Sequence, residues 1–207
     1  MKKIIIIGGS FGGLTAAFEL RRHLGRRVEI TLVAEIDYFA YAPSFPWVAL
    51  GLRKPEDITV RLDNLLSRKG IKFLQANVQK IDPVIQEVDV GYRSLSYDYL
   101  VIATGAYLDF EAIPGLGPEK GYTHSIMTLE HTVETYQAWQ QYLEKGGPIV
   151  IGSTQGVSCF GPAYEFIFGL EHELWKHGLR EKASLTFVTS EPYISHFGLA
   201  DFVRRVG

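Results

Sequence analysis

The sequence predicts an α/β fold with largely parallel sheets. Three observations predict this class. Apolar strands alternate with amphipathic helices along the chain. A glycine-rich turn at residues 8–13 joins the first strand to the first helix, and a strand–helix–strand order returns after residue 148. Together they predict two Rossmann-like dinucleotide-binding units, the second incomplete, and a small antiparallel β insert.

The first unit opens with a βαβ motif in the first 35 residues. Strands are expected over residues 2–7 and 28–33, and a helix over residues 12–24 carries apolar side chains near one face. The next elements are expected in the order helix 58–69, strand 71–81, strand 84–90 with a turn at Pro83 before it, and strand 97–103.

A loop rich in glycine and proline at residues 113–121 is the candidate domain boundary. We therefore expect one Rossmann-like domain over residues 1–112 and the start of a second, truncated one over residues 113–207. The elements expected in the second domain are helix 129–145, strand 148–151, helix 162–177 and strand 185–189.

Composition excludes several classes of protein. The 207 residues hold 21 Lys and Arg against 23 Asp and Glu, a net charge of −2, so no nucleic-acid partner is expected. A single cysteine, Cys159, excludes an intramolecular disulfide framework and a zinc site of several thiolates, and no metal is expected. The apolar run Ile4–Ile7 is too short for a signal peptide or a span of about 18 residues, which makes the cytoplasm the default location.

The turn after the first strand resembles a dinucleotide fingerprint. Gly8 permits the tight turn, Gly13 lets the helix pack close to the strand, and the amides around Gly12 face a pyrophosphate at the helix N-terminus. Ser10 replaces the second glycine of the pattern, and its hydroxyl can donate to a phosphate oxygen. Glu35, 22 residues beyond Gly13, can accept hydrogen bonds from both ribose hydroxyls.

Two further loops follow strands. Thr104 and Gly105 end an apolar strand, where ligands bind in open α/β sheets. The loop at 152–157 has Val157 where a third glycine is wanted, which weakens a pyridine-nucleotide site. Because NAD and FAD share the first fingerprint, the residues leave the choice between them open.

Cys159 stands just before the last helix, in a positive field that favours a thiolate. Most lone cysteines are instead buried and inert. Glu165, one helical turn beyond Gly161, is either a base near this thiol or a first-turn acid that complements the helix dipole. The residues alone leave both alternatives open.

Longer motifs carry a specific resemblance. Four runs keep one order and spacing over nearly the whole chain: Tyr38–Gly51 with Pro43 and Trp47, Tyr97–Gly105, Gly156–Glu165, and Thr189–Tyr193 followed by His196. In this pattern the chain resembles the sulfide:quinone oxidoreductases, FAD-dependent members of the pyridine nucleotide-disulfide oxidoreductase superfamily. Trp47 would then lie near the flavin, while simple core packing is the alternative for this residue.

The resemblance implies FAD as cofactor, sulfide oxidised to polysulfide or sulfur, and electrons passed to a membrane quinone. It also implies that residues 1–112 form the FAD-binding domain and that residues 113–207 begin a second, NAD-like domain. Cys159 would carry a persulfide, and Glu165, His196 and His131 match further catalytic positions of the family. The positions that match cofactor contacts are Gly8, Ser10, Gly12, Gly13, Glu35, Pro43, Val78, Thr104, Gly105 and Gly161.

Two departures from the family matter. Met127 stands where the family usually has a cysteine, in the run Ser125-Ile126-Met127-Thr128, so this member either works without that thiol or has lowered activity. The family's proteins are about twice as long, so the chain would lack the relay partner of Cys159, the quinone pocket and the C-terminal helices that dock the parent peripherally on the membrane. We therefore expect little activity from the isolated chain.

Three alternatives stay open at this point. The chain is the N-terminal half of a sulfide:quinone oxidoreductase, a flavoprotein similar to flavocytochrome c sulfide dehydrogenase or type II NADH:quinone oxidoreductase, or a non-catalytic FAD-binding fragment. The NADH alternative needs a good second nucleotide loop, which residues 152–157 do not supply. Association into a homo-oligomer also stays open.

Overall fold

The computed structural model describes residues 1–157 and 159–194. The chain divides into two compact units. The first holds Met1–Tyr41 and Glu56–Ile113, and the second holds Ala42–Pro55 together with the described residues from Pro114 onward. The predicted α/β class is confirmed, whereas the assignment of residues 1–112 to flavin binding and of 113–207 to a second nucleotide domain stays a prediction.

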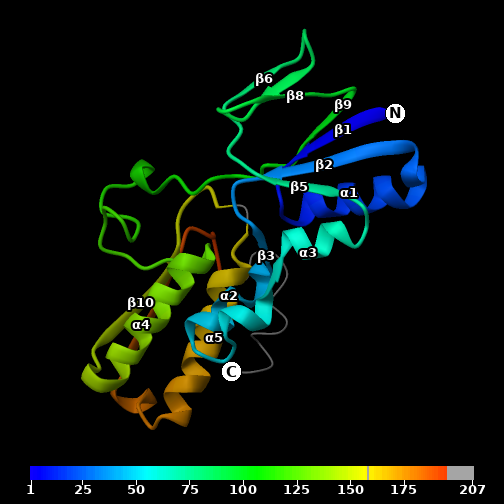
Figure 1. Cartoon of the computed structure of the whole chain (residues 1–207). Coiled ribbons are helices and arrows are strands. Elements are labelled where there is room, and N and C mark those ends of the chain that lie inside the picture. The colour runs from blue at the N-terminus through cyan, green and yellow to red at the C-terminus, as the bar shows by residue number, and fades with distance from the viewer. Residues whose placement is uncertain (158, 195–207) are drawn as a thin grey trace. The chain divides into compact units, whose positions relative to one another are not determined.

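A parallel sheet of four strands forms the centre of the first unit (Figure 1). Its order is β5 (Lys72–Gln75), β2 (Val28–Ala34), β1 (Lys2–Ile7) and β9 (Tyr99–Ile102). All three neighbouring pairs run parallel, with Ile7 opposite both Val33 and Ile102. The carboxyl ends of β1, β2 and β9 therefore reach the same edge of the sheet.

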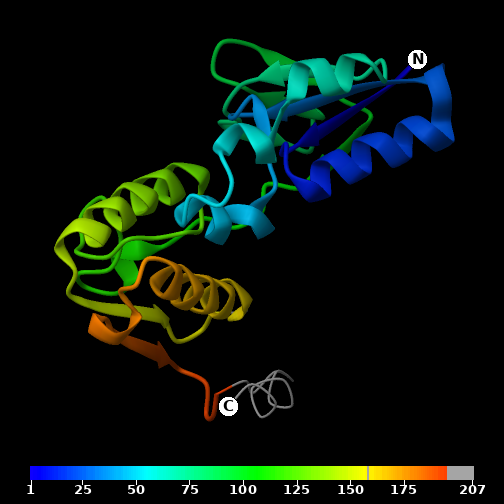
Figure 2. The ribbon, with the colours of Figure 1, turned by 90° about the horizontal axis from the view of Figure 1, so that it is seen from below.

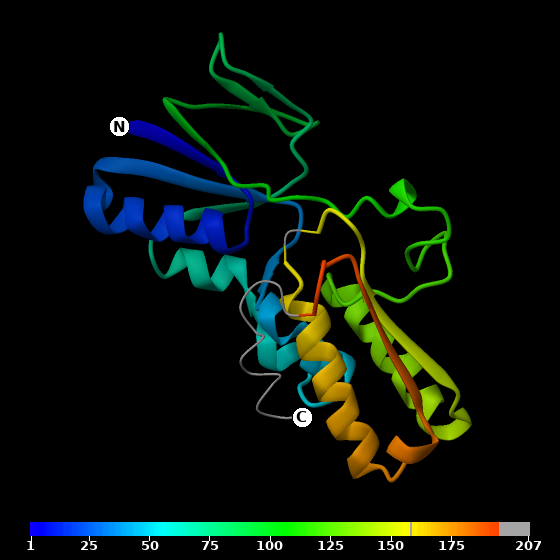
Figure 3. The same cartoon turned by 180° about the vertical axis from the view of Figure 1, so that it is seen from behind.

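The two faces of β1 bury alternate side chains, as a strand inside a layered fold requires. Ile4 and Ile6 pack in one cluster with residues of the helices α1 (Phe11–Leu24) and α3 (Leu62–Ser67). Ile5 and Ile7 pack in another cluster on the opposite face, with Val88. Figure 3 shows the resulting three layers from behind, with the helices on one side of the sheet and the antiparallel insert on the other.

The antiparallel insert has three strands in the order β6 (Lys80–Asp82), β7 (Glu87–Asp89) and β8 (Ser94–Ser96). The predicted strand over residues 71–81 is therefore wrong as one element, because β5 and β6 belong to different sheets. The strand predicted over 97–103 is shorter in the structure, where it is β9. The hydropathy pattern does not show that one sheet ends at β5 and that another begins at β6.

The helix predicted over residues 58–69 is also shorter than expected. Residues Thr59–Arg61 form β4, which pairs antiparallel with β3 (Tyr38–Ala40), and α3 begins only at Leu62. The β-branched Thr59 and Val60 favour an extended chain, and a partner strand is available for them. A pattern of leucines continuing to Leu66 gave no sign of this local pairing.

The second unit contains α4 (Leu129–Lys145), β10 (Pro148–Ser153), α5 (Gly161–Lys176) and β11 (Ser184–Thr189), which can be followed by colour in Figure 2. β10 and β11 are parallel, with Pro148 opposite Ser184. The short helix α2 (Phe45–Ala49) packs against both α4 and α5. Single 3-10 turns complete the list of elements: η1 (Gly25–Arg27), η2 (Ala42–Ser44), η3 (Pro55–Ile58), η4 (Phe110–Ala112) and η5 (Arg180–Lys182).

The core of the second unit joins these elements. Leu50, Trp139, Ile151, Leu170 and Leu174 are buried in one cluster. Among the described residues, no helix combines the length and the apolar character that crossing a bilayer requires.

Candidate functional site

The turn between β1 and α1 has a shape that only glycine permits. Gly8 has φ +114°, and a Cβ built on it would lie 2.2 Å from the carbonyl oxygen of Ala103. A Cβ on Gly13 would lie 1.9 Å from the carbonyl oxygen of Gly8. Both distances are far below any real contact, so Gly8 lets the turn approach Ala103 and Gly13 lets α1 pack onto the turn.

The N-terminus of α1 suits an anion. The helix has 14 residues and no acidic residue in its first turn, so its dipole is not already neutralised there. Ser10 occupies the N-cap position, is exposed, and makes no capping hydrogen bond with its side chain. A Cβ on Gly12 would make only an ordinary contact of 3.5 Å with Ala103, so Gly12 is less constrained than its neighbours. This cradle fits a pyrophosphate.

The other predicted dinucleotide contacts of the first unit converge on the same sheet edge. The amide of Gly8 donates to the carbonyl of Val33 at 2.8 Å, and the amide of Ala103 donates to the carbonyl of Ile7 at 2.8 Å. Glu35 follows β2 and is exposed, while Thr104 and Gly105 follow β9. Residues far apart in the sequence thus meet where ligands bind in open α/β sheets.

Val78 occupies a different kind of position. It lies between β5 and β6, partly buried, and packs against the cluster that contains Ile5, Ile7 and Val33. Its side chain therefore has a packing role in the structure, and its predicted contact with the cofactor stays a prediction.

Sequence reasoning missed an aromatic group beside the glycine turn. The ring of Phe11 meets that of Phe39 edge to face at 5.0 Å between centroids, and that of Tyr41 at 6.0 Å. Phe11 and Tyr41 remain 47% and 45% exposed, although both are large and apolar or amphipathic. The sequence feature that could have indicated this aromatic group is Phe11, which stands inside the glycine motif.

Cys159 lies just before α5 in the second unit and is an exposed free thiol. The reading as a buried, inert cysteine is therefore wrong. A Cβ on Gly161 would lie 3.5 Å from Cys159 Sγ, which places the thiol over the first residue of α5. This is an ordinary contact distance, so a side chain at Gly161 would touch the sulfur without displacing it.

Glu165 is an exposed residue of α5, beyond its first turn, which contains no acidic residue. The reading as a first-turn acid is therefore wrong. The carboxylate instead accepts a hydrogen bond of 2.7 Å at Oε1 from Nε1 of Trp47, a residue of α2. Trp47 is 39% exposed, so simple core packing does not describe it. Pro43 lies nearby in the sequence, exposed in η2.

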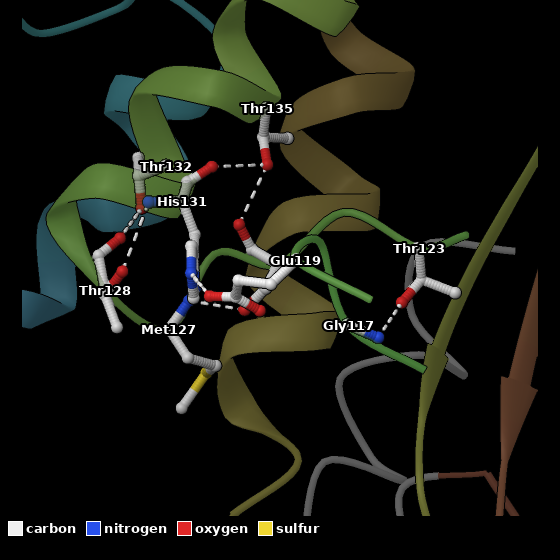
Figure 4. Close-up of polar contacts among 9 residues, drawn as sticks. Gly117, Glu119, Thr123, Met127, Thr128, His131, Thr132 and Thr135 are labelled. Carbon is white, nitrogen blue, oxygen red and sulfur yellow. Dashed lines mark hydrogen bonds and ion pairs between the residues drawn. The ribbon is translucent and has the colours of Figure 1, made fainter. Parts of the chain in front are cut away.

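His131 lies in the first turn of α4. Its backbone amide donates to Oγ1 of the N-cap residue Thr128 at 3.1 Å. Its Nε2 lies 2.7 Å from Oε1 of Glu119, and its side chain is only 13% exposed (Figure 4). The hydrogen bond from the backbone amide of Glu119 itself, and then the contact with His131, lower the pKa of the Glu119 carboxyl.

Met127 stands on a segment that is hydrogen-bonded to α4. The amide of Met127 donates to Oγ of Ser125 at 3.2 Å, and Oγ1 of Thr135 donates to the carbonyl of Ser125 at 2.8 Å (Figure 4). The hydroxyl of Thr135 also reaches the carbonyl of His131 at 2.8 Å. Met127 is 49% exposed, so its thioether occupies an accessible and well-anchored position.

His196 lies outside the described residues. Within residues 1–157 and 159–194, no three His, Cys, Asp or Glu side chains are placed to hold a metal ion. The described candidates fall into two sets: Gly8, Ser10, Gly12, Gly13, Glu35, Val78, Thr104 and Gly105 in the first unit, and Pro43, His131, Cys159, Gly161 and Glu165 in the second.

Comparisons with known proteins agree with this architecture. Residues 2–157 match the family model described as pyridine nucleotide-disulphide oxidoreductase. The chain is 46% identical over 199 residues to the sulfide-quinone reductase of Aquifex aeolicus, covering 96% of this chain and 45% of that protein. It is 28% identical over 195 residues to the mitochondrial sulfide:quinone oxidoreductase of Mus musculus, covering 91% and 42%. The chain thus spans about half the length of the curated relatives it matches.

The crystal structure of the Aquifex aeolicus sulfide:quinone oxidoreductase gives the same result in three dimensions. It superposes with a TM-score of 0.91 at 42% identity, covering all of this chain and 48% of that one. The resemblance predicted from the motifs is therefore confirmed, and so is the Rossmann-type fold. The chain belongs to the pyridine nucleotide-disulphide oxidoreductase family, a family of oxidoreductases.

Proposed function

We propose that this chain binds FAD and supplies the flavin-binding part of an enzyme that oxidises sulfide to polysulfide or sulfur and passes the electrons to a membrane quinone. The observation that carries the proposal is the cradle at Gly8 and Gly13, whose geometry excludes any side chain. Similarity to sulfide-quinone reductases supports the choice of substrate and of electron acceptor.

The residues of the first unit would hold the cofactor as follows. Backbone amides at the start of α1, with the hydroxyl of Ser10, would bind the pyrophosphate. The carboxylate of Glu35 would accept from the ribose hydroxyls, and the turn at Thr104 and Gly105 would approach the ligand from the neighbouring strand. When bound, FAD accepts two electrons from a reduced substrate and releases them to a quinone.

The second unit would supply the groups that handle sulfur and protons. Cys159 is an exposed free thiol that stands just before the N-terminus of the 16-residue helix α5. We assign it the role of sulfur carrier, as a persulfide. Forming one S–S bond from hydrosulfide and the thiolate would release one proton and two electrons, and the bound FAD would supply the two-electron acceptor. Glu165 and His131 are the described groups that would exchange such a proton.

The same proposal places the parent enzyme peripheral on the membrane, because quinones lie in the bilayer, and we propose the cytoplasmic side as its location. The contacts with sulfide and quinone would be made by the parent protein as a whole.

A second candidate function is a non-catalytic FAD-binding fragment. The observation that favours it is that the glycine cradle belongs wholly to the first compact unit, whereas Cys159, Glu165 and His131 belong to the second.

The experiment compares the 207-residue chain with the full product of the gene that encodes it. Both are purified, their flavin absorbance is recorded, and sulfide is added without oxygen. We expect the full gene product to be yellow from bound flavin, and we expect sulfide to bleach this flavin absorbance. A yellow product that sulfide never bleaches contradicts the enzyme proposal and leaves the binding fragment, and a colourless product contradicts both.

A further inference from the structure

Trp47 is joined to Glu165 across 118 positions of sequence by a hydrogen bond of 2.7 Å from the indole Nε1–H to Oε1. Both residues belong to the second compact unit, Trp47 in α2 and Glu165 in α5. The proposed function uses Glu165 and leaves Trp47 without a role. An indole has a single N–H donor and no acceptor. In this contact Trp47 is therefore the donor and the Glu165 carboxylate is the acceptor.

The ring of Trp47 is itself held in place. The guanidinium carbon of Arg53 lies 4.3 Å from the ring centroid, a cation–π contact that covers one face. Nη1 of Arg53 donates to Oγ of Ser44 at 2.6 Å, and Ser44 is only 3% exposed. The amides of Leu52 and Arg53 both donate to the carbonyl of Trp47, at 2.8 and 3.3 Å. The chain therefore folds back over the indole and anchors it to a buried hydroxyl.

The two helices are also fixed against each other. A Cβ on Gly169 of α5 would lie 2.9 Å from Cδ1 of Leu50, so this glycine admits a side chain from the end of α2. Leu50 is buried in the same cluster as Leu170 and Leu174. The backbones that carry Trp47 and Glu165 are thus set by core packing, and the indole hydrogen bond is left to orient the carboxylate.

Filling the core does not account for Trp47. Its neighbours Pro46 and Val48 are buried, whereas Trp47 is 39% exposed and directs its polar edge at an exposed carboxylate. Glu165 stands one helical turn beyond Gly161, and Cys159 Sγ lies over that glycine. The hydrogen bond therefore acts on a carboxylate carried by the same end of α5 as the thiol.

We propose that Trp47 is a positioning residue: its indole N–H holds the Glu165 carboxylate in one orientation, and Arg53 with Ser44 holds the indole. The proposal rests on the proposed function, in which Glu165 exchanges protons near Cys159. An exposed glutamate otherwise samples several rotamers. In the other rotamers the carboxylate is not oriented for the proposed proton exchange.

The first test measures the hydrogen bond in the 207-residue chain. Proton–nitrogen NMR spectra show one indole signal for each of the three tryptophans, and W47F identifies that of Trp47. We expect E165A to move the Trp47 signal upfield, because it removes a charged acceptor, and to leave the signal of Trp175 on the same helix unchanged. An unmoved Trp47 signal overturns the proposal.

The second test measures positioning in the full gene product, as the rate of flavin reduction by sulfide. W47F keeps an aromatic ring and removes only the donor, and W175F is the matched control on the exposed part of α5. We expect W47F to lower the rate on the order of tenfold, a usual coupling between contacting residues, and to lower it little further in an E165A background. W175F should leave the rate unchanged.

The outcomes separate the two proposals. Equal losses from W47F in the wild-type and E165A backgrounds would mean that Trp47 acts through packing alone, which overturns its positioning role and leaves the proposed function intact. A wild-type product that sulfide does not reduce overturns the proposed function, and the role of Trp47 with it, even where the NMR signal confirms the bond.

Discussion

Nε2 of His131 lies 2.7 Å from Oε1 of Glu119, so an imidazole that is 13% exposed is paired with a carboxylate from the loop before it. This pairing fixes the ring at the start of α4, beside the segment that carries Met127. A carboxylate that accepts from one imidazole nitrogen favours the tautomer with the proton on that nitrogen. His131 is thereby oriented by a residue that the sequence motifs did not indicate.

The first prediction concerns the pH dependence of Glu119. Its pKa is lowered, first by its own backbone amide and then by His131. A lowered carboxyl pKa contributes stability that is present above the usual value of 4.5 and lost as the pH falls through the folded-state value. We expect H131Q to move the Glu119 titration back toward higher pH, with the backbone bond retaining part of the shift. Carbon NMR titration of the side-chain carboxyl measures this, and identical midpoints in both proteins would refute it.

The second prediction concerns the glycine cradle. G13A brings a Cβ within 1.9 Å of the Gly8 carbonyl oxygen, so either the helix or the turn must move. We expect lost flavin binding and a loss of about 1–3 kcal/mol in the free energy of unfolding, the usual cost of forcing an extra group into a well-packed site. Urea unfolding of the chain measures the stability.

The control for this variant is G70A. Gly70 has φ +65° and a Cβ there would meet no other atom, so alanine should cost only about 1–2 kcal/mol, the cost of a left-handed conformation, and should leave flavin binding unchanged. Equal losses from G13A and G70A would show that the close approach at Gly8 does not constrain the turn.

The third prediction concerns Glu35. Its side chain is exposed at the carboxyl end of β2, so E35Q should leave the free energy of unfolding almost unchanged. Hydrogen bonds donated to a charged acceptor contribute roughly 1.5–3 kcal/mol, so flavin affinity should fall by about 10- to 100-fold. Fluorescence titration with FAD measures the affinity, and an unchanged dissociation constant would contradict the role in ribose binding.

The fourth prediction concerns Met127. Because this side chain is 49% exposed and its backbone is held by Ser125, M127C should change the free energy of unfolding by no more than about 0.5 kcal/mol. Thiol titration of the native chain should then count two accessible thiols instead of one. In the full gene product we expect faster flavin reduction by sulfide, and a slower rate would show that the thioether itself is needed.

Much of the fold could be predicted from the sequence. The helix over residues 129–145 was predicted with the bounds of α4, and the turn at 8–13 was placed correctly because its glycines follow a strand and open a helix. Short pairings were not predictable, because the choice between helix and strand at Thr59–Arg61 depends on β3, whose paired residues lie 19 to 23 positions earlier in the chain.

The candidate site was predictable only in part. Motifs indicated Cys159, Glu165 and His131, but not the partners that orient them. Trp47 contacts Glu165 across 118 positions of sequence, and Glu119 contacts His131 across 12. A local sequence pattern does not indicate contacts between residues so far apart in the chain. The segment Ala42–Pro55 groups with the second unit although the sequence places it between parts of the first, and this grouping brings Trp47 to Glu165.

The rate of flavin reduction in the full gene product, with sulfide and NADH compared side by side in the absence of oxygen, tests the central claim most directly. We expect rapid bleaching by sulfide, recovery of the oxidised spectrum on adding a quinone, and slow reduction by NADH, because Val157 interrupts the second nucleotide loop. Faster reduction by NADH than by sulfide, or no bleaching by sulfide at all, would contradict it.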